Sequence, residues 1–454
     1  MGTGKIVLAA GASGSGKTMI TCVLLEVLKR YGKKLVSFKC GPDYIDPQFH
    51  EQVLHIKSRN LDTFFTGQEK TRADFERISA GADLAVVEGV MGYYDGIAGI
   101  STIASTYDVA GAIAAPVVLI VDCRGMSLSI LSLIKGFLTF REDSRIKGVI
   151  LNRISPMLYP RIKEEIEAQL NILVLGYVPN LPEMNLESRH LGLILPDEIE
   201  ELEASLRTAA DVLEQTLDID GILTLAGRDE VSRVDDHPRQ TEAPARERVR
   251  IALAQDAAFC FMYQDNLQML KERGAELIPF SPIDDKKLPE DISGLLLYGG
   301  YPELYAGKLA RNQSMLEEIR NALSSGVICM AECGGFLYLH ETLEDMQGDK
   351  HQMVGVIPGH AFKTDKLSRF GYITLKQGMV FGKPVGDIPA HEFHYFDSDL
   401  CGTAFQAVKP QSTRSWPAMH SSNTLFAGFP HLYYRANEQV ADAFMAACNG
   451  KERR

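Results

Sequence analysis

Short apolar runs alternate with helically spaced apolar residues along the first half of the chain. The runs that are short and mostly apolar lie at 5–10, 35–38, 84–88, 117–121 and 148–152. Strands of this kind are typically buried on both faces, as in a parallel sheet covered by helices. Between the first two runs, residues 18–31 carry apolar residues at helical spacing. The alternation predicts βαβ units.

A change of composition divides the chain. Residues 198–217 have the pattern of an amphipathic helix, and residues 228–247 combine many charges and two prolines with no aromatic residue, which is typical of a linker. The second half again has an α/β pattern. Strands are expected at 249–254, 294–297 and 327–330, and helices at 316–323 and 438–448. We predict an α/β protein with domains at 1–227 and 248–454.

Composition narrows the function classes. The 454 residues are 45% hydrophobic and 23% charged, with a net charge of −12, which argues against nucleic-acid binding through phosphate neutralisation. No apolar run approaches the roughly 20 residues that span a bilayer, and no secretory signal precedes the first strand. We therefore expect a cytoplasmic protein with no membrane partner. The eight cysteines include no CxxC pair, which disfavours a zinc ribbon.

Residues 11–18 read GASGSGKT and fit the phosphate-binding pattern G-x-x-x-x-G-K-S/T in full. Glycines let backbone N–H groups surround phosphate oxygens, and the following helix adds positive potential. Lys17 would pair with the terminal phosphates of ATP, and Thr18 would offer its hydroxyl to Mg²⁺. A Gly/Ser turn with a chance GKT is the alternative, and the strand–loop–helix context disfavours it. The expected nucleotide-binding residues are Gly11, Ser13, Gly14, Ser15, Gly16, Lys17, Thr18 and Lys39.

Acidic residues follow two further strands, in the segments SFKCGPDYIDPQF and VVEGVMGYYDG. Ligands bind outside the carboxyl ends of parallel strands, so Glu88 should face the nucleotide together with Lys39 at the end of its own strand. Asp43 and Asp46 lie in a loop that contains proline. A lone aspartate there would more often be a solvated turn residue, but the joint placement favours Mg²⁺ binding or substrate activation. Thr18, Asp43 and Glu88 are the expected metal ligands.

A cysteine in the second half has the surroundings of a nucleophile. Cys333 follows an apolar strand and precedes Gly334 and Gly335, as in a nucleophile elbow. The helix that begins there should lower the pKa of the thiol. Gly299 and Gly300, in LLLYGGYPE, could form an oxyanion hole with Gly334. Cys329, inside the strand, is better explained as a structural thiol.

Three histidines compete as the base that activates this thiol. His391 and His394 share the strand-like segment 390–396, where residues three apart point to opposite faces, so both cannot aim at one sulfur. Glu392 between them suggests a metal, but no third ligand cluster is apparent. His431 follows a Phe-Pro pair and should lie in a turn before the last helix. Local sequence alone does not choose among the three.

The ordered set of motifs resembles the cobyrinic acid a,c-diamide synthase family along nearly the whole chain. The motifs read GSGKT, FKCGPDYIDPQFH, SRNLD, EGVMGYYDG, SRHLGL, GGYPELYA, AECGGFLYL and HEFHY. The resemblance implies a P-loop, dethiobiotin-synthetase-like parallel-sheet domain followed by a class I glutamine amidotransferase-like α/β domain. It also implies ATP- and glutamine-dependent amidation of the a and c acetate groups of cobyrinic acid in cobalamin synthesis, through an acyl phosphate and channelled ammonia.

The resemblance also implies residue roles. Cys333 matches the family's nucleophile and His431 its activating histidine, whereas the usual triad glutamate, two residues after the histidine, is Tyr433 here. Residues expected to line the tetrapyrrole site are Tyr44, Asp46, Arg59, Asn60, Asp95 and Arg189. A substrate with many carboxylates needs arginines for bidentate pairing, although Arg59 and Arg189 could instead bridge loops. We expect small-molecule partners and allow for a homodimer.

Other functions remain to be separated. Tetrapyrrole amidases that act on nickel-sirohydrochlorin or sirohaem-type substrates share these motifs. A partitioning or switch ATPase would carry a signature lysine at position 12, which is Ala12 here, and would leave the thiol domain unexplained. A stand-alone binding module explains neither domain.

Overall fold

The computed structural model describes residues 3–180, 196–227, 248–367 and 369–451. The chain folds into two compact units, Met1–His237 and Pro238–Arg454. The predicted linker, 228–247, lies outside the described residues. The predicted domain limits therefore stay predictions.

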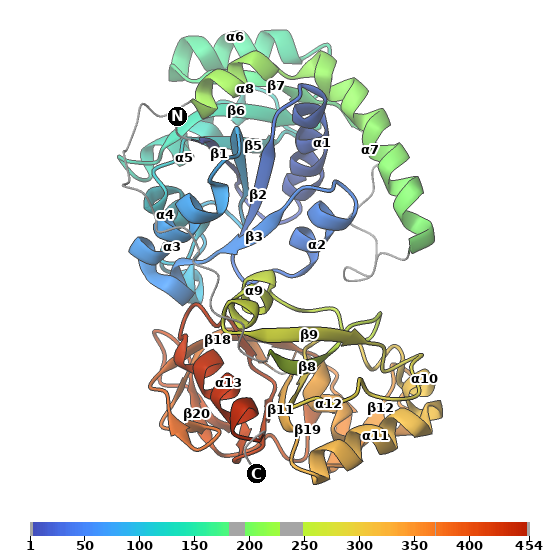
Figure 1. The fold of residues 1–454 in the computed structure, drawn as a ribbon. Coiled ribbons are helices and arrows are strands. Elements are labelled where there is room, and N and C mark those ends of the chain that lie inside the picture. Colours follow the sequence, from blue (N-terminus) through green and yellow to red (C-terminus); the bar gives the residue numbers. More distant parts are fainter. Residues whose placement is uncertain (1–2, 181–195, 228–247, 368, 452–454) are drawn as a thin grey trace. The chain divides into compact units, whose positions relative to one another are not determined.

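The first unit is built on a seven-stranded sheet in the order β3-β2-β4-β1-β5-β6-β7, in which every strand pair is parallel (Figure 1). Its strands are β1 (Gly4–Ala10), β2 (Leu35–Cys40), β3 (Ser58–Leu61), β4 (Leu84–Glu88), β5 (Val117–Asp122), β6 (Ile146–Asn152) and β7 (Leu173–Val178). The parallel α/β expectation is confirmed. The two edge strands, β3 and β7, were not predicted as strands.

Helices cover both faces of this sheet because its strands are apolar on both sides. Ile6 and Leu8 belong to one core, whereas Val7 and Ala9 belong to the other. The first core is covered by α1 (Lys17–Arg30), α2 (Ile45–Gln52), α7 (Pro196–Thr216) and α8 (Ile219–Ala226). The second is covered by α3 (Thr63–Ser79), α4 (Thr106–Ala112), α5 (Ser129–Thr139) and α6 (Tyr159–Leu170). The predicted closing helix is α7, and α8 follows it.

The second unit has a six-stranded sheet in the order β22-β23-β11-β10-β8-β9. Its strands are β8 (Val249–Ala254), β9 (Ala275–Phe280), β10 (Gly294–Leu297), β11 (Ile328–Glu332), β22 (His420–Ser421) and β23 (Leu425–Gly428). All its pairs are parallel except that of β22 with β23. The helices of this unit are α9 (Gln264–Glu272), α10 (Ala306–Arg311), α11 (Gln313–Ser324), α12 (Gly334–Tyr338) and α13 (Gln439–Lys451).

Short strands, mostly antiparallel, form three further sheets between α12 and α13. A four-stranded sheet holds β12 (His340–Glu344), β13 (Lys350–Gln352), β14 (Ile357–Lys363) and β19 (Phe396–Ser398). A five-stranded sheet holds β15 (Arg369–Lys376), β18 (Ile388–His394), β20 (Phe405–Val408), β21 (Ser415–Ala418) and β24 (His431–Leu432), and β16 (Met379–Val380) pairs with β17 (Lys383–Pro384). Of these strands, only the region of β18 was predicted, as one segment at 390–396, and the structure divides it at Tyr395 between β18 and β19.

Candidate active sites

The predicted phosphate loop connects β1 to α1 and is held by residues at the end of β6. Asn152 donates a hydrogen bond from Nδ2 to the carbonyl of Ser15 at 2.9 Å, and Arg153 donates to the carbonyl of Gly14 at 3.0 Å. Gly14 and Gly16 have φ angles of 72° and 84°, in the left-handed region that glycine adopts at low cost. With these carbonyls held by β6, the loop has the form expected of a phosphate cradle.

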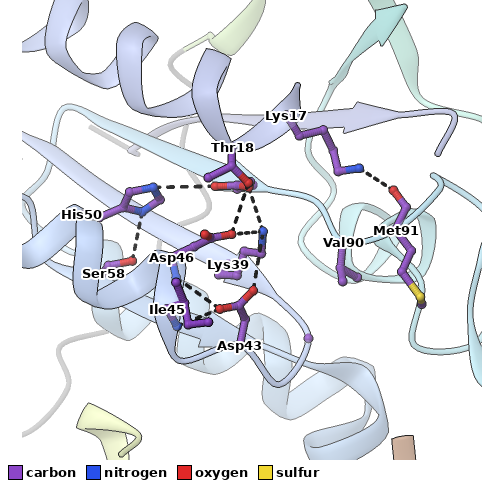
Figure 2. A network of polar contacts seen from close by, with 12 residues as sticks. Lys17, Thr18, Lys39, Asp43, Ile45, Asp46, His50, Ser58, Val90 and Met91 are labelled. Atoms are coloured by element: carbon purple, nitrogen blue, oxygen red, sulfur yellow. Dashed lines mark hydrogen bonds and ion pairs between the residues drawn. The ribbon is translucent and has the colours of Figure 1, made fainter. Parts of the chain in front are cut away.

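Lys17 lies at the start of α1 with its side chain folded over the loop (Figure 2). Its Nζ donates to the carbonyl of Met91 at 2.5 Å and to that of Ala12 at 3.1 Å. Burial, and then the charge of Lys39, lower the pKa of Lys17 to about 8. Both carbonyls are neutral acceptors, so an anionic phosphate would be a stronger partner for this ammonium.

A buried ion cluster lies beside the loop because β2 and β4 are neighbours in the sheet. Lys39 and Glu88 are register partners, and Lys39 Nζ is 2.7 Å from Glu88 Oε1. Lys39 also contacts the carboxylate of Asp46 and lies 3.9 Å from Asp43 Oδ2 (Figure 2). Burial opposes the charge of Lys39, but Asp46 and then Glu88 raise its pKa well above the usual value. One cation therefore faces three carboxylates.

Thr18 connects the phosphate loop to this cluster. Its hydroxyl donates to Glu88 Oε1 at 2.6 Å. Burial, followed by the charge of Asp46, raises the pKa of Glu88 to about 8, and burial with the same neighbour raises that of Asp43 to about 6. Burial also opposes ionisation of Asp46, but its contacts with Lys39 lower its pKa on balance. Three acidic side chains are thus gathered next to the phosphate-binding loop, and burial opposes the ionisation of each.

The donors in this cluster fit a hard divalent cation. They are hydroxyl and carboxylate oxygens, and Glu88 Oε2 is buried with no hydrogen-bond partner among the described residues. Within the same described ranges, no group of three or more His, Cys, Asp or Glu side chains could hold a metal alone. Mg²⁺ usually takes one or two protein carboxylates and completes its shell with water and substrate phosphates. The cluster satisfies that requirement.

The predicted substrate residues have varied surroundings. Asn60 donates from Nδ2 to the carbonyls of Gly41 and Asp43, at 2.9 and 2.7 Å, and so fixes the loop that carries the acids. Arg59 donates to Glu51 Oε1 at 2.5 Å, which is the loop-bridging alternative. Asp95 accepts the N–H of Gly92 at 2.9 Å.

Two further predicted substrate residues follow β2, and Asp46 lies in the first turn of α2 and not in a loop as expected. Asp46 is part of the ion cluster, and Tyr44 precedes α2 as its N-cap residue. Arg189 lies outside the described residues.

Cys333 lies at a sharp turn between β11 and α12. Its φ and ψ angles are 46° and −104°, a combination that is strained for a residue with a Cβ and is found where a fold aims a side chain. Its N–H donates to the carbonyl of Gly428 at 2.8 Å, which ties the turn to the end of β23.

The expectation of a lowered thiol pKa is wrong for this structure. The thiol is buried and burial raises its pKa, to which the charge of Glu303 adds. The helix behind it has only five residues and does not outweigh the loss of solvation.

The predicted oxyanion glycines lie next to both candidate catalytic residues. A Cβ on Gly334 would lie 3.0 Å from the backbone nitrogen of Gly300, and a Cβ on Gly299 would lie 2.5 Å from Cε1 of His431. The glycines are therefore needed for close approach, and they connect the turn at Cys333 to the imidazole. These contacts connect Gly299, Gly300, Gly334, Cys333 and His431, to which catalytic roles were assigned from the sequence and the family resemblance.

His431 is buried and lies in the short strand β24, so its predicted place in a turn is wrong. The residues Ala390 and His391 of β18 pair with Leu432 and His431, which makes this segment a strand. Burial, followed by the charges of His391 and His394, lowers the pKa of His431 to about 3, so the imidazole is neutral. A neutral imidazole is the form that can accept a proton from a thiol.

The competing histidines have other neighbours. His394 stacks on Phe429 with ring centroids 3.8 Å apart, and its Nδ1 lies 2.5 Å from the carbonyl of Phe396. His391 packs edge-on against Tyr372. Both rings are buried, and burial lowers the pKa of each, to about 4 for His394 and about 3 for His391.

Comparison with known proteins matches two parts of the chain to two different families. Residues 6–194 match the CobQ/CobB/MinD/ParA nucleotide binding domain, and residues 250–438 match the CobB/CobQ-like glutamine amidotransferase domain. The cobyrinate a,c-diamide synthase of Caldanaerobacter subterraneus subsp. tengcongensis is 37% identical over 452 residues, which cover 98% of this chain and 98% of the relative.

The chain belongs to the cobyrinate a,c-diamide synthase family. The synthases of this name from Salmonella typhimurium and Listeria monocytogenes serovar 1/2a are 37% and 35% identical, over 97% and 95% of this chain and 97% of each relative. This member is a glutamine-dependent ligase of cobalamin biosynthesis with a nucleotide-binding P-loop domain, as the motifs predicted. No helix in the described ranges is long and apolar enough to cross a membrane.

Three residues beside the sites of this family member were not singled out from the sequence. His50 lies in the motif FKCGPDYIDPQFH, and its Nε2 is 3.6 Å from Glu88 Oε2. Its Nδ1 is 3.1 Å from the hydroxyl of Ser37 and 3.4 Å from that of Ser58 (Figure 2 shows the contact with Ser58). Asn152 ends a predicted strand, which was a usable signal. Glu332 precedes Cys333, and its acidic character inside an apolar strand was the signal that went unused.

Proposed function

We propose that this chain catalyses ATP- and glutamine-dependent amidation of the a and c acetate carboxylates of cobyrinic acid. The observation that carries the proposal is the 37% identity to a cobyrinate a,c-diamide synthase along 98% of both chains. The phosphate loop with its buried acids and the strained thiol turn supply the two half-reactions that such an amidation needs.

In the first unit, the loop N–H groups, Lys17 and Lys39 bind and neutralise the phosphates of ATP. The predicted nucleotide set is completed by Gly11, Ser13, Gly14, Ser15, Gly16 and Thr18. Thr18, Asp43 and Glu88 would hold Mg²⁺, which when bound offsets phosphate charge. A carboxylate oxygen of the substrate attacks the γ-phosphorus, and the bond to the bridging oxygen breaks. The products are an acyl phosphate and ADP.

Residues of β3, of the start of α2 and of the segments after β2 and β4 bind the tetrapyrrole in this proposal, together with Arg189, which lies outside the described residues. The residues assigned to that role are Tyr44, Asp46, Arg59, Asn60, Asp95 and Arg189. Arg59 is the described arginine among these residues, and its guanidinium makes a charge-assisted contact with Glu51. A substrate carboxylate would replace or extend that contact.

In the second unit, His431 takes the proton of Cys333, and the thiolate attacks the amide carbon of glutamine. The oxyanion that forms lies against backbone N–H groups of Gly299, Gly300 and Gly334. The imidazolium returns its proton to the departing nitrogen, so ammonia and a thioester form, and water then releases glutamate. Ammonia attacks the acyl phosphate without first mixing with the solvent and displaces phosphate, which leaves the amide.

The test is incubation with ATP, Mg²⁺, glutamine and a candidate tetrapyrrole, followed by mass spectrometry. We expect cobyrinic acid to give a product with two amides and two equivalents of ADP. Amidation of nickel-sirohydrochlorin, with cobyrinic acid left unchanged, would overturn the substrate assignment but keep the reaction class. ATP hydrolysis without any amide would overturn both.

We also propose a cytoplasmic location. All eight cysteines are free thiols and six of them are buried, as suits a reducing compartment. Labelling with a membrane-impermeant thiol reagent in intact and lysed cells tests this: Cys260 and Cys401, the two partly exposed thiols, should react only after lysis.

A further inference from the structure

A buried carboxylate lies between the two residues proposed for the glutaminase reaction. Glu332 is the last residue of β11 and directly precedes Cys333. Its Oε2 accepts the N–H of Leu432 at 3.2 Å and lies 4.0 Å from Nδ1 of His431. The same carboxylate oxygen is therefore bonded to the strand that carries the imidazole and is at ion-pair distance from the imidazole itself.

The position where a triad acid is usual serves another contact. Tyr433, two residues after His431, donates its hydroxyl to Asp265 at 3.2 Å and stacks edge-on against Tyr263. That side chain is therefore engaged with α9 and the residue before it. An acid that supports the imidazole must come from another element, and β11 supplies one.

The buried surroundings of Glu332 make a carboxylate at this position unfavourable for folding unless it also has a functional role. It is 2% exposed, its Oε1 has no hydrogen-bond partner among the described residues, and burial raises its pKa to about 8. A glutamine there could still accept the N–H of Leu432 without the cost of burying a charge. An imidazolium 4.0 Å away would favour the ionised carboxylate and offset that cost.

We propose that Glu332 is the positioning residue of His431: its carboxylate fixes the imidazole through the Nδ1 side and stabilises the imidazolium that forms. Nε2 is then the nitrogen that takes the Cys333 proton, as in triads where a buried acid orients a histidine. Only the thiol proton moves, from sulfur to Nε2, and it leaves on the departing ammonia. This inference rests on the proposed roles of Cys333 and His431.

A direct effect of Glu332 on the sulfur has the opposite sign, which makes the inference testable. The charge of Glu332 itself helps to raise the pKa of the Cys333 thiol, as the charge of Glu303 does more strongly. Removing a carboxylate that acts only on sulfur should therefore speed thiolate formation. Removing one that acts through His431 should slow it.

The experiment measures glutaminase kinetics and alkylation of Cys333 by iodoacetamide at pH 7 in full-length Glu332→Gln, with Glu303→Gln as the matched control. We expect Glu332→Gln to lower the glutaminase kcat on the order of 10²-fold with little change in the glutamine KM, and to slow alkylation. Glu303→Gln should speed alkylation. Ammonia-dependent amidation should persist in Glu332→Gln, which shows that the protein is folded.

A double-mutant cycle tests whether the effect of Glu332→Gln on the alkylation rate depends on the imidazole of His431. In the His431→Ala background, Glu332→Gln should change alkylation less than about twofold. Wild-type kcat in Glu332→Gln, faster alkylation, or an undiminished effect without His431 would each overturn the inference.

Glu332→Asp keeps the charge and should fall between the wild type and Glu332→Gln. If Glu332→Gln does not fold, Glu332→Asp can be compared with the wild type in the same two measurements. Equal kcat values for Glu332→Asp and Glu332→Gln would overturn the inference. Glutaminase activity that survives Cys333→Ser would instead overturn the proposed thiol chemistry.

Discussion

His391 and His431 are register partners in the antiparallel pair of β18 and β24, and both are buried. Burial lowers the pKa of both imidazoles to about 3; His391 and His394 add to the effect on His431, and Lys409 adds to that on His391. Two neutral imidazoles thus lie side by side in the strands that complete the thiol site. Each must take up a proton when the second unit unfolds in acid.

This pairing predicts that the second unit loses stability in mild acid. Each histidine has a pKa near 6.5 when unfolded and a lower one when folded, so the unfolded state binds more protons below pH 6.5. The contribution of the two neutral imidazoles to the free energy of unfolding is complete above pH 6.5 and is lost progressively as the pH falls toward 3. From pH 7 to pH 5, His391→Gln should lose about 1–2 kcal/mol less unfolding free energy than wild type. Urea unfolding followed by Trp416, the single tryptophan, measures this in the second unit.

The exposed His360, in β14 of the same unit, provides the control for acid stability. His360→Gln should lose as much free energy as the wild type. Equal losses in wild type and His391→Gln would show that the buried imidazole does not govern acid stability.

Alanine variants at His431, His391 and His394 separate the candidate bases. His431→Ala should slow alkylation of Cys333 and remove glutaminase activity, because an imidazole partner is needed to take the thiol proton. Ammonia-dependent synthesis should persist. If His391→Ala or His394→Ala gives this result and His431→Ala does not, the assignment of the base is wrong.

Cys333→Ser should abolish amidation with glutamine and leave amidation with concentrated ammonium salts close to wild type. Ammonia enters after the thioester stage, so it bypasses the lost nucleophile. Cys329→Ser, four residues earlier and inside β11, is the matched control and should keep glutamine-dependent activity. Continued use of glutamine by Cys333→Ser would mean that another residue is the nucleophile.

Lys17→Ala should lower amidation with either nitrogen donor by a factor on the order of 10²–10³, because charge that develops on the phosphate loses its cation. Glutamine hydrolysis should partly survive, since Cys333 and His431 belong to the other unit. The measurement is product formation against glutamate release in the same sample. Normal product formation would refute the phosphate role of the loop.

Arg59→Ala should raise the KM for the tetrapyrrole several-fold more than that for ATP, because a substrate carboxylate loses a bidentate partner. Glu51→Ala is the comparison, since it removes the carboxylate that pairs with this arginine, together with its hydrogen bond to the N–H of Ser58. If Arg59 merely bridges to Glu51, both variants should change the two KM values alike, and steady-state kinetics distinguishes the two outcomes.

The sequence alone determined the features that contiguous residues encode. The GASGSGKT loop is a local pattern between an apolar run and an amphipathic one, and β4, β8 and β10 have the predicted bounds. The turn at Cys333 was equally local, because two glycines follow the cysteine at the end of an apolar strand. Each of these depends on backbone conformations that a few neighbouring side chains set.

The tertiary structure decided what depends on strand order and burial. Lys39 and Glu88 meet because β2 pairs with β4, and no local pattern specifies that pairing. His431 looked like a turn residue because a strand of two residues has no periodicity, and only its pairing with β18 makes it one. The thiol pKa is raised, not lowered, because solvation is lost through the whole surrounding fold. Long-range packing sets the ionisation of a buried group, and the residues that do this lie far apart in the sequence.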